Sequence, residues 1–178
     1  MDEGWGVSNA LLGLAQAALA RSDAATAAEM LAEAEALSRT AGDWFTLSAN
    51  LSVQALAARL RGEESQAAAR LHESIKLAAK LRDAWTVVLC ISGLAGVASS
   101  QGRDARSARL FGSAEALREK MGVEVSWSAW RTLNERSLAL ARGKLDEETF
   151  AAAWTEGRGM SFEEAVAYAL EDDEVSPN

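Results

Sequence analysis

The chain has 178 residues, a formal net charge of −8 and a pI near 4.8. This balance argues against non-specific binding to nucleic acid, which needs clustered Lys and Arg. No apolar run reaches the roughly 18 residues needed to span a membrane, and no basic-then-apolar leader opens the chain. We therefore expect a soluble, cytoplasmic protein with no membrane partner.

The most informative pattern is a repeat at an interval of about 40 residues. The stretch GDWFTLSANLS at 42–52 returns as RDAWTVVLCIS at 82–92, so that Asp43 matches Asp83 and Thr46 matches Thr86. Further sets that match at the same step are Trp5, Phe45 and Trp85; Val7, Leu47 and Val87; Leu11, Leu51 and Ile91; and Ala15, Ala55 and Ala95. These matches predict three units, at about residues 1–42, 43–82 and 83–122.

Each unit is predicted to hold two helices, because the apolar spacing is helical and the one proline, Pro177, lies in the tail. The first helices are expected at about 5–21, 44–61 and 84–101, and the second at about 24–40, 64–81 and 104–121. Gly62 and Gly102 suit the tight turn between them, and Ser22 fills the same place. Small residues are expected where the two helices cross, with larger ones beside them. The small ones are Ala27, Ala67, Ser107, Ala34, Ser74 and Ala114, and the larger ones are Leu31, Leu71 and Phe111.

After residue 122 the repeat degrades into a fourth, irregular unit with capping helices at about 123–170. Helices are expected at about 126–142, 147–156 and 162–170. Asp146 is predicted to cap the second of these, and Ser161 with Glu164 forms a capping box for the third. Residues 171–178 are predicted to be a disordered acidic tail.

The repeated units resemble tetratricopeptide repeats. The first unit carries the pattern at Leu14, Ala15, Ala18, Ser22, Ala27, Leu31 and Ala34, and the third at Leu94, Ala95, Ala98, Gly102, Ser107, Phe111 and Ala114. The second unit departs from it where Gln54 replaces a leucine. The resemblance implies an all-α fold, a right-handed α-solenoid of helical hairpins with a C-terminal helical cap.

Two longer stretches resemble something more specific. ARLFGSAEALREKMG at 108–122 and FAAAWTEGRGMSFEEAVAYAL at 150–170 are similar to the C-terminal helical arm of large bacterial ATPase-type regulators. That group includes the LuxR-type, AfsR/SARP-type and cyclase-coupled multidomain regulators, in which an ATPase module precedes the arm and a helix-turn-helix often follows. The 178 residues contain no GxxxxGK[ST] phosphate loop. The resemblance implies the sensor or regulatory arm of a transcriptional regulator, either excised or stand-alone.

The residues predict no catalytic, cofactor or metal site, so we do not expect an enzyme. His72 is the one histidine and Cys90 the one cysteine, which excludes two-histidine zinc sites and an internal disulfide. His72 is expected on a helix flank, and Cys90 is expected to be a half-buried structural thiol. The carboxylate pairs are adjacent or two apart and do not converge on one point.

The functional surface of such a solenoid is usually its concave face. If the tetratricopeptide geometry holds, that face carries Asn9, Gln16, Ser52, Arg59, Leu89, Ser92 and Ser99. We expect it to suit an extended peptide or a partner helix, although the same residues could simply be solvent-exposed. Trp127 and Trp130, three apart on one helix, could pack on the third unit or bind a ligand or partner.

Three functional hypotheses follow. The first is a protein–protein interaction scaffold whose partner is another protein, a peptide or other domains of the same regulator. The second is a small-molecule-binding module that uses the aromatic helix at about 126–142. The third is a stand-alone tetratricopeptide adaptor. The first hairpin begins at once with Val7, Leu11 and Leu14, so an excised arm is expected to form a homodimer through it.

Overall fold

The computed structural model describes residues 3–122 and 127–171, and of residues 3–5 it describes only the backbone. Predictions about the Trp5 side chain, about residues 123–126 and about tail residues 172–178 lie outside this part. Within it, all regular structure is helical, so the predicted all-α class is confirmed. The helices are α1 (Glu3–Ala20), α2 (Ala24–Ala41), α3 (Trp44–Leu60), α4 (Glu64–Lys80), α5 (Ala84–Ser100), α6 (Asp104–Met121), α7 (Ser128–Lys144), α8 (Glu147–Arg158) and α9 (Phe162–Leu170).

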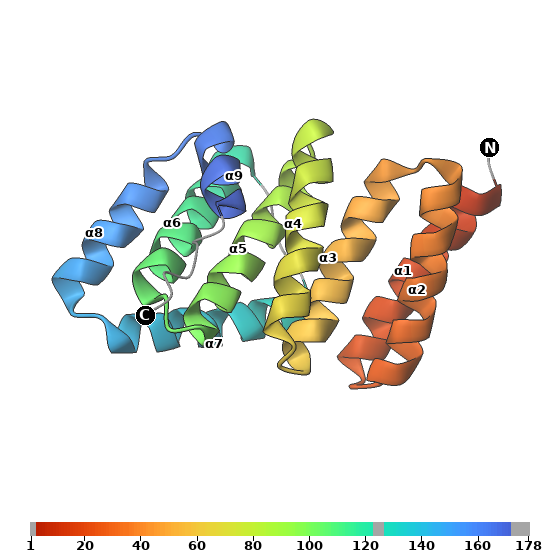
Figure 1. The fold of residues 1–178 in the computed structure, drawn as a ribbon, viewed down its shortest axis with the longest axis horizontal. Helices are drawn as coiled ribbons and strands as arrows, with labels where there is room; N and C mark the ends of the chain where they lie inside the picture. The colour runs from red at the N-terminus through yellow and green to blue at the C-terminus, as the bar shows by residue number, and fades with distance from the viewer. Residues whose placement is uncertain (1–2, 123–126, 172–178) are drawn as a thin grey trace.

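The first six helices form a row in which each packs against the next in the chain (Figure 1). Helix α7 then runs across this row, α8 lies against α6, and α9 packs near α4, α5 and α6. None of the helices in the described ranges is both long enough and apolar enough to cross a membrane.

Helix starts in this fold follow a repeated local rule. Asp43 and Asp83 each accept a hydrogen bond from the backbone N–H three residues on, at 3.0 and 3.3 Å. Such a cap satisfies one of the N–H groups that have no partner within the helix. Asp146 caps α8 in the same way, and Ser161 with Glu164 forms a complete capping box on α9, as predicted. At α6 the N-cap position holds Arg103, whose side chain makes no capping bond, and the acidic residue of the first turn is Asp104.

The turns inside the hairpins contain residues in the left-handed backbone region. Gly62 and Gly102 have φ angles of 76° and 74° there, and Ser22 has the same sign at 63°. The prediction that Ser22 takes the glycine place is therefore confirmed. A non-glycine residue in this region costs free energy, which the surrounding turn compensates through its backbone hydrogen bonds.

The predicted helix crossings are the centre of the core. Every residue expected there is buried, with exposed fractions from 0% to 6%: Ala27, Ala67, Ser107, Leu31, Leu71, Phe111, Ala34, Ser74 and Ala114. The small side chains let two helix axes approach, and the larger ones fill the space beside them. Ser74 also donates to the Ser48 carbonyl at 2.7 Å, which ties α4 to α3.

We expect Leu71→Ala to lower the free energy of unfolding by about 2–5 kcal/mol, because the fully buried side chain leaves a cavity that its neighbours close only in part. Lys76→Ala, on the exposed side of the same helix, is the control and should change stability by under about 0.5 kcal/mol. Urea unfolding followed by circular dichroism measures both. Equal effects of the two substitutions would contradict the helix register.

Helices α6 and α8 make the closest crossing outside the hairpins. A Cβ atom added at Gly157 would lie 1.9 Å from the Arg109 carbonyl oxygen, and one at Gly112 would lie 2.4 Å from the Trp154 carbonyl oxygen. Only glycine permits backbones to approach so closely. The crossing directs α8 along the side of α6. Within α8, Trp154 stacks on Phe150 four residues earlier, with ring centroids 5.8 Å apart.

Candidate functional site

Helix α7 determines how much of the surface formed by the first helices of the hairpins is open to a binding partner. It lies along the side of the row to which the first helices of the hairpins contribute, packing on α5 and touching α1 (Figure 1). We call the surface formed by α1, α3 and α5 on this side the groove. The groove is the place where the sequence predicted a partner-binding face, and α7 occupies part of it.

The seven residues predicted for the open face divide into two groups. Ser52, Arg59, Leu89 and Ser99 are buried, whereas Asn9, Gln16 and Ser92 are half-buried. Solvent exposure of the first group was therefore a wrong expectation. Arg59 and Ser99 are covered by α7, and Leu89 belongs to the main core. The Ser52 hydroxyl is satisfied within its own helix by the Ala49 carbonyl. Binding of a partner by these residues stays a prediction.

Arg59 is the strongest polar link between the groove and α7. Its guanidinium donates to Asn134 Oδ1 at 2.7 Å and to Ser137 Oγ at 3.0 Å. The side chain lies directly over Gly96, where an added Cβ would meet its guanidinium at 1.9 Å. Glycine at this position therefore creates the space in which a long cationic side chain can lie buried between α5 and α7.

The charge of the buried Arg59 guanidinium is only partly neutralised by nearby groups. The nearest carboxylate is Glu64, whose Oε2 lies 4.0 Å from Arg59 Nε, and neither of these two atoms has a hydrogen-bond partner. Burial lowers the pKa of the Arg59 guanidinium and raises the pKa of the Glu64 carboxyl. The link between groove and α7 is consequently polar and carries a desolvation cost.

The two tryptophans proposed as ligand aromatics have different environments. Trp130 is 1% exposed, and its Nε1–H donates to Ser92 Oγ at 3.2 Å. Trp127 is half-buried and meets Trp85 edge-on, with ring centroids 5.2 Å apart. Both rings therefore contribute to holding α7 on the hairpins. Trp127 also lines a small cavity of about 320 Å³ beside Gln16 and Leu56, and Trp130 lines a larger one.

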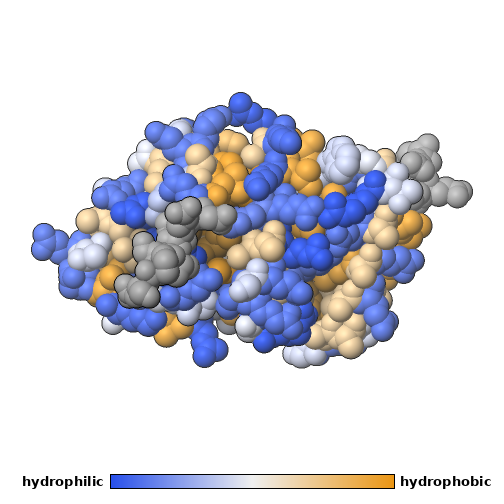
Figure 2. All heavy atoms as spheres, in the orientation of Figure 1, coloured by the Kyte–Doolittle hydropathy of each residue, from blue (hydrophilic) through white to orange (hydrophobic). Residues whose placement is uncertain are grey.

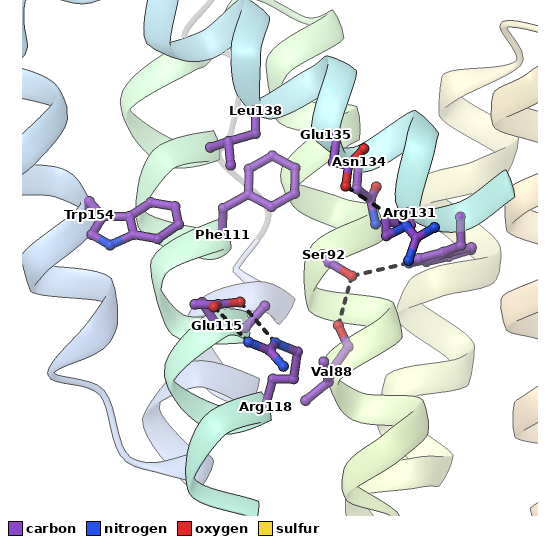
Figure 3. A pocket seen from close by; sticks show the side chains of 12 residues that line it. Val88, Ser92, Phe111, Glu115, Arg118, Arg131, Asn134, Glu135, Leu138 and Trp154 are labelled. Carbon is purple, nitrogen blue, oxygen red and sulfur yellow. Dashed lines mark hydrogen bonds and ion pairs between the residues drawn. The ribbon is translucent and has the colours of Figure 1, made fainter. Parts of the chain in front are cut away.

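The larger cavity is a cleft of about 620 Å³ beside α7 (Figure 3). Its walls come from α5, α6, α7 and α8. The lining residues are Val88, Ser92, Phe111, Ala114, Glu115, Arg118, Trp130, Arg131, Asn134, Glu135, Leu138 and Trp154. Figure 3 shows Trp154 and Phe111 on one side of the cleft and Arg131 on the other. The volume lies within the range of about 300–1,000 Å³ that is usual for small-molecule sites.

Two pairs of opposite charges stand at the rim of the cleft. Arg118 donates to both carboxylate oxygens of Glu115, at 3.0 and 2.8 Å, and this hydrogen bonding lowers the pKa of the Glu115 carboxyl. Arg131 and Glu135 lie farther apart, with Nε and Oε1 separated by 3.9 Å. The rim therefore combines one hydrogen-bonded pair with one loose pair.

The residues considered for chemistry are placed as follows. Cys90 is fully buried against Ser74 Oγ at 3.1 Å, and burial raises the pKa of its thiol to about 12. A protonated, inaccessible thiol is a poor nucleophile. His72 is half-buried on α4. In residues 3–122 and 127–171, no three His, Cys, Asp or Glu side chains gather in a way that could hold a metal ion.

Packing of Trp127 and Trp130 on the third unit, one of the two predicted alternatives, is confirmed by their contacts with Trp85 and Ser92. Sequence reasoning missed that α7 also covers Arg59 and Ser99, and it missed the cleft beside α7. One signal was present: Trp130, Ser137 and Ala141 are the buried residues of α7, and their spacings of seven and four place them on one helix face. That spacing indicates a buried face but does not say what covers it. The cleft residues come from four helices, so no local pattern unites them.

Comparison with known proteins finds three similar proteins. Proteins of Mycobacterium bovis and of two strains of Mycobacterium tuberculosis, each named "Putative HTH-type transcriptional regulator", are 33% identical to this chain over 156 residues. The match covers 88% of this chain but only 17% of each relative. No family model and no solved structure matches the chain. The chain is thus similar to one segment of much longer proteins that bear a regulator's name.

Proposed function

We propose that this chain is the regulatory arm of a bacterial transcriptional regulator and that it works by binding other protein segments, without catalysis of its own. The similarity to the mycobacterial regulators supports a regulatory role. The observation that carries the binding role is the seating of α7. Side chains of α3 and α5 hold a helix that crosses them, through Arg59, Ser92 and Ser99. Recognition of an amphipathic helix in a groove is a common mode of partner binding.

We infer further that α1 to α6 are three tetratricopeptide-like hairpins of a right-handed solenoid, capped by α7 to α9. The N-caps Asp43 and Asp83, each with a Thr three residues on, support equivalence of the second and third hairpins. In the LuxR-type and related regulators that the sequence resembles, an ATPase module precedes such an arm, and we propose that this arm acts on such a module. A stand-alone adaptor is the alternative within the same class, and it would use the same groove.

The expected partners are a protein, a peptide or other domains of the same regulator. The net charge of −8 disfavours direct contact of this segment with nucleic acid, because few cations are available to replace the counterions of phosphate groups. Cytoplasmic location and signal transduction follow from the same proposal.

A regulatory role can be tested in the source bacterium. In-frame removal of codons 1–170 should change a defined set of transcripts, measured by RNA sequencing. The wild-type chain and Arg136→Gln, a variant on the exposed side of α7, should restore them. Arg59→Gln should fail at equal protein abundance, because it weakens the link between groove and helix. Transcript levels that do not respond to the deletion would reject the regulatory role.

Self-association through the first hairpin is the second part of the proposal. On α1, Val7 and Leu14 are 47% and 54% exposed, whereas the equivalent Leu47, Val87 and Leu94 are 0%, 0% and 6% exposed. A preceding helix covers the equivalents. Figure 2 shows apolar side chains at the surface over the α1–α2 hairpin. We propose that the same face of a second copy covers Val7 and Leu14.

We expect Leu14→Lys to give a monomer where the wild-type chain is a dimer in light scattering, because a charge at the two-fold contact is repelled by its own copy. Leu140→Lys, which changes an equally exposed leucine on α7, is the matched control and should remain dimeric. A wild-type chain that is monomeric at high concentration would contradict the proposed dimer.

A specific observation also favours a second candidate function, the binding of a small-molecule effector. The cleft of about 620 Å³ beside α7 is lined by six apolar or aromatic residues and six polar or charged ones. Its volume and its aromatic walls with polar groups nearby are typical of ligand sites. An effector bound there would touch both α6 and α7, so its binding could change how α7 packs on its part of the groove.

A further inference from the structure

The cleft beside α7 is built from two chemically distinct parts. Its inner part is apolar, formed by Phe111, Leu138 and Trp154 together with the edge of Trp130. Trp154 is fixed in place by the glycine crossing of α6 and α8 and by its stacking on Phe150. A flat ring system can pack between such side chains, because aromatic faces and edges attract one another at this separation.

The outer part of the cleft offers mainly hydrogen-bond donors. Asn134 Oδ1 accepts from Arg59, so the other side of this amide, its NH₂ group, faces away from Arg59. Arg131 is 62% exposed at its side chain, and its distance of 3.9 Å to Glu135 is longer than a hydrogen bond. A guanidinium has five N–H donors and no acceptor.

Most acceptors of the rim are already used. Both oxygens of Glu115 accept hydrogen bonds from Arg118. The Ser92 hydroxyl donates to the Val88 carbonyl and accepts from Trp130.

Glu135 is the remaining acceptor, and its side chain is 69% exposed, so its carboxylate can stay hydrated while a ligand takes its place beside Arg131. The donors left for that ligand are Arg131 and the Asn134 amide, and the strongest partner for donors of which one is cationic is an anion.

We propose that the cleft binds a compact organic anion, a molecule with a flat apolar ring body and one carboxylate or sulfonate group. The ring body packs between Phe111, Leu138 and Trp154, and the anionic group accepts hydrogen bonds from Arg131 and the Asn134 amide. Displacing Glu135 from Arg131 costs little, because exposed ion pairs contribute only about 0–1 kcal/mol. This inference rests on the second function proposed above, the binding of an effector.

The test uses two fluorescent probes of the same shape. 1-Anilinonaphthalene-8-sulfonate carries the anionic group, and N-phenyl-1-naphthylamine is its uncharged counterpart. We expect the wild-type chain to bind the sulfonate at one saturable site. Arg131→Gln should weaken sulfonate binding about tenfold while the affinity for the uncharged probe stays within about twofold, because only the charged hydrogen bond is lost. Arg131→Lys should recover part of the loss.

Three control variants locate the site. Arg136→Gln removes an exposed charge of the same helix and should change neither affinity. Leu14→Lys alters the apolar face of α1 and should also leave both affinities unchanged. Trp154→Ala and, as a milder change, Leu138→Gln should weaken both probes, with folding of each variant verified by circular dichroism.

The outcomes distinguish a failure of the anion proposal from a failure of the proposed effector-binding function. If Arg131→Gln leaves sulfonate affinity unchanged, or shifts both probes equally, the anion class is wrong although the cleft still binds a ligand. If folded Trp154→Ala and Leu138→Gln variants leave both affinities unchanged, neither probe occupies the cleft. The anion proposal and the effector-binding function are then both rejected.

Discussion

Replacing Trp130 with alanine is expected to lower the free energy of unfolding by about 3–5 kcal/mol, the range for removal of a large buried aromatic side chain. The ring is 1% exposed and fills the space between α7 and the hairpins. Its loss also leaves Ser92 Oγ without the N–H that donates to it. Chemical denaturation followed by circular dichroism gives the value.

Trp44→Ala is the control for that experiment, since Trp44 is 50% exposed. Its substitution should cost under about 1 kcal/mol, in line with exposed positions generally. If Trp130→Ala costs no more than Trp44→Ala, then α7 does not seal the groove. The interpretation of Trp130 as a packing residue would then give way to the ligand-binding interpretation.

A second large effect is expected from the smallest possible change, Gly157→Ala. The added methyl would lie 1.9 Å from the Arg109 carbonyl oxygen and 3.0 Å from the Ser113 nitrogen, both backbone atoms that cannot rotate away. Helices α6 and α8 must separate to admit it, and such overpacking costs about 1–3 kcal/mol. This loss should exceed the gain of up to about 1 kcal/mol that alanine brings to a helix interior.

Gly143→Ala is the matched substitution, because Gly143 is also helical and an added Cβ there meets nothing within 4 Å. It should raise stability by up to about 1 kcal/mol through helix propensity alone. Opposite signs for the two alanines, read from thermal or urea midpoints, would verify the close crossing. A stabilising Gly157→Ala would show that α6 and α8 are farther apart than described.

The features of this fold that the sequence predicts are those formed by residues close to one another in the chain. The caps at Asp43 and Asp83 and the turn at Ser22 are each set by residues three or fewer positions apart, so their residue types indicate them directly. The buried crossings followed from small and large residues that return at one interval. Such features need no knowledge of what lies across the molecule.

The groove could not be predicted in the same way. Arg59 meets Ser137 across 78 positions of sequence, and this contact depends on where the irregular C-terminal helices pack. An open groove was assumed because nothing in the hairpins themselves says that a later helix fills it. Phe111 shows the same limit, since it was correctly predicted as a core residue while its place at the cleft depends on α7 and α8.

Because α7 occupies part of the groove, it would lower the apparent affinity of the proposed partner for that groove. Helix and groove belong to one molecule, so α7 competes at an effective concentration that is roughly millimolar for short tethers. If an outside helix binds the same groove, as proposed above, its apparent dissociation constant is larger than its intrinsic one. The factor is one plus the ratio of the effective concentration of α7 to the dissociation constant of α7. When α7 leaves, water rehydrates Arg59 and Glu64, which offsets part of the lost contact energy. The buried guanidinium therefore weakens the hold of α7 and lowers the free energy that a partner of the proposed kind would have to supply to displace it.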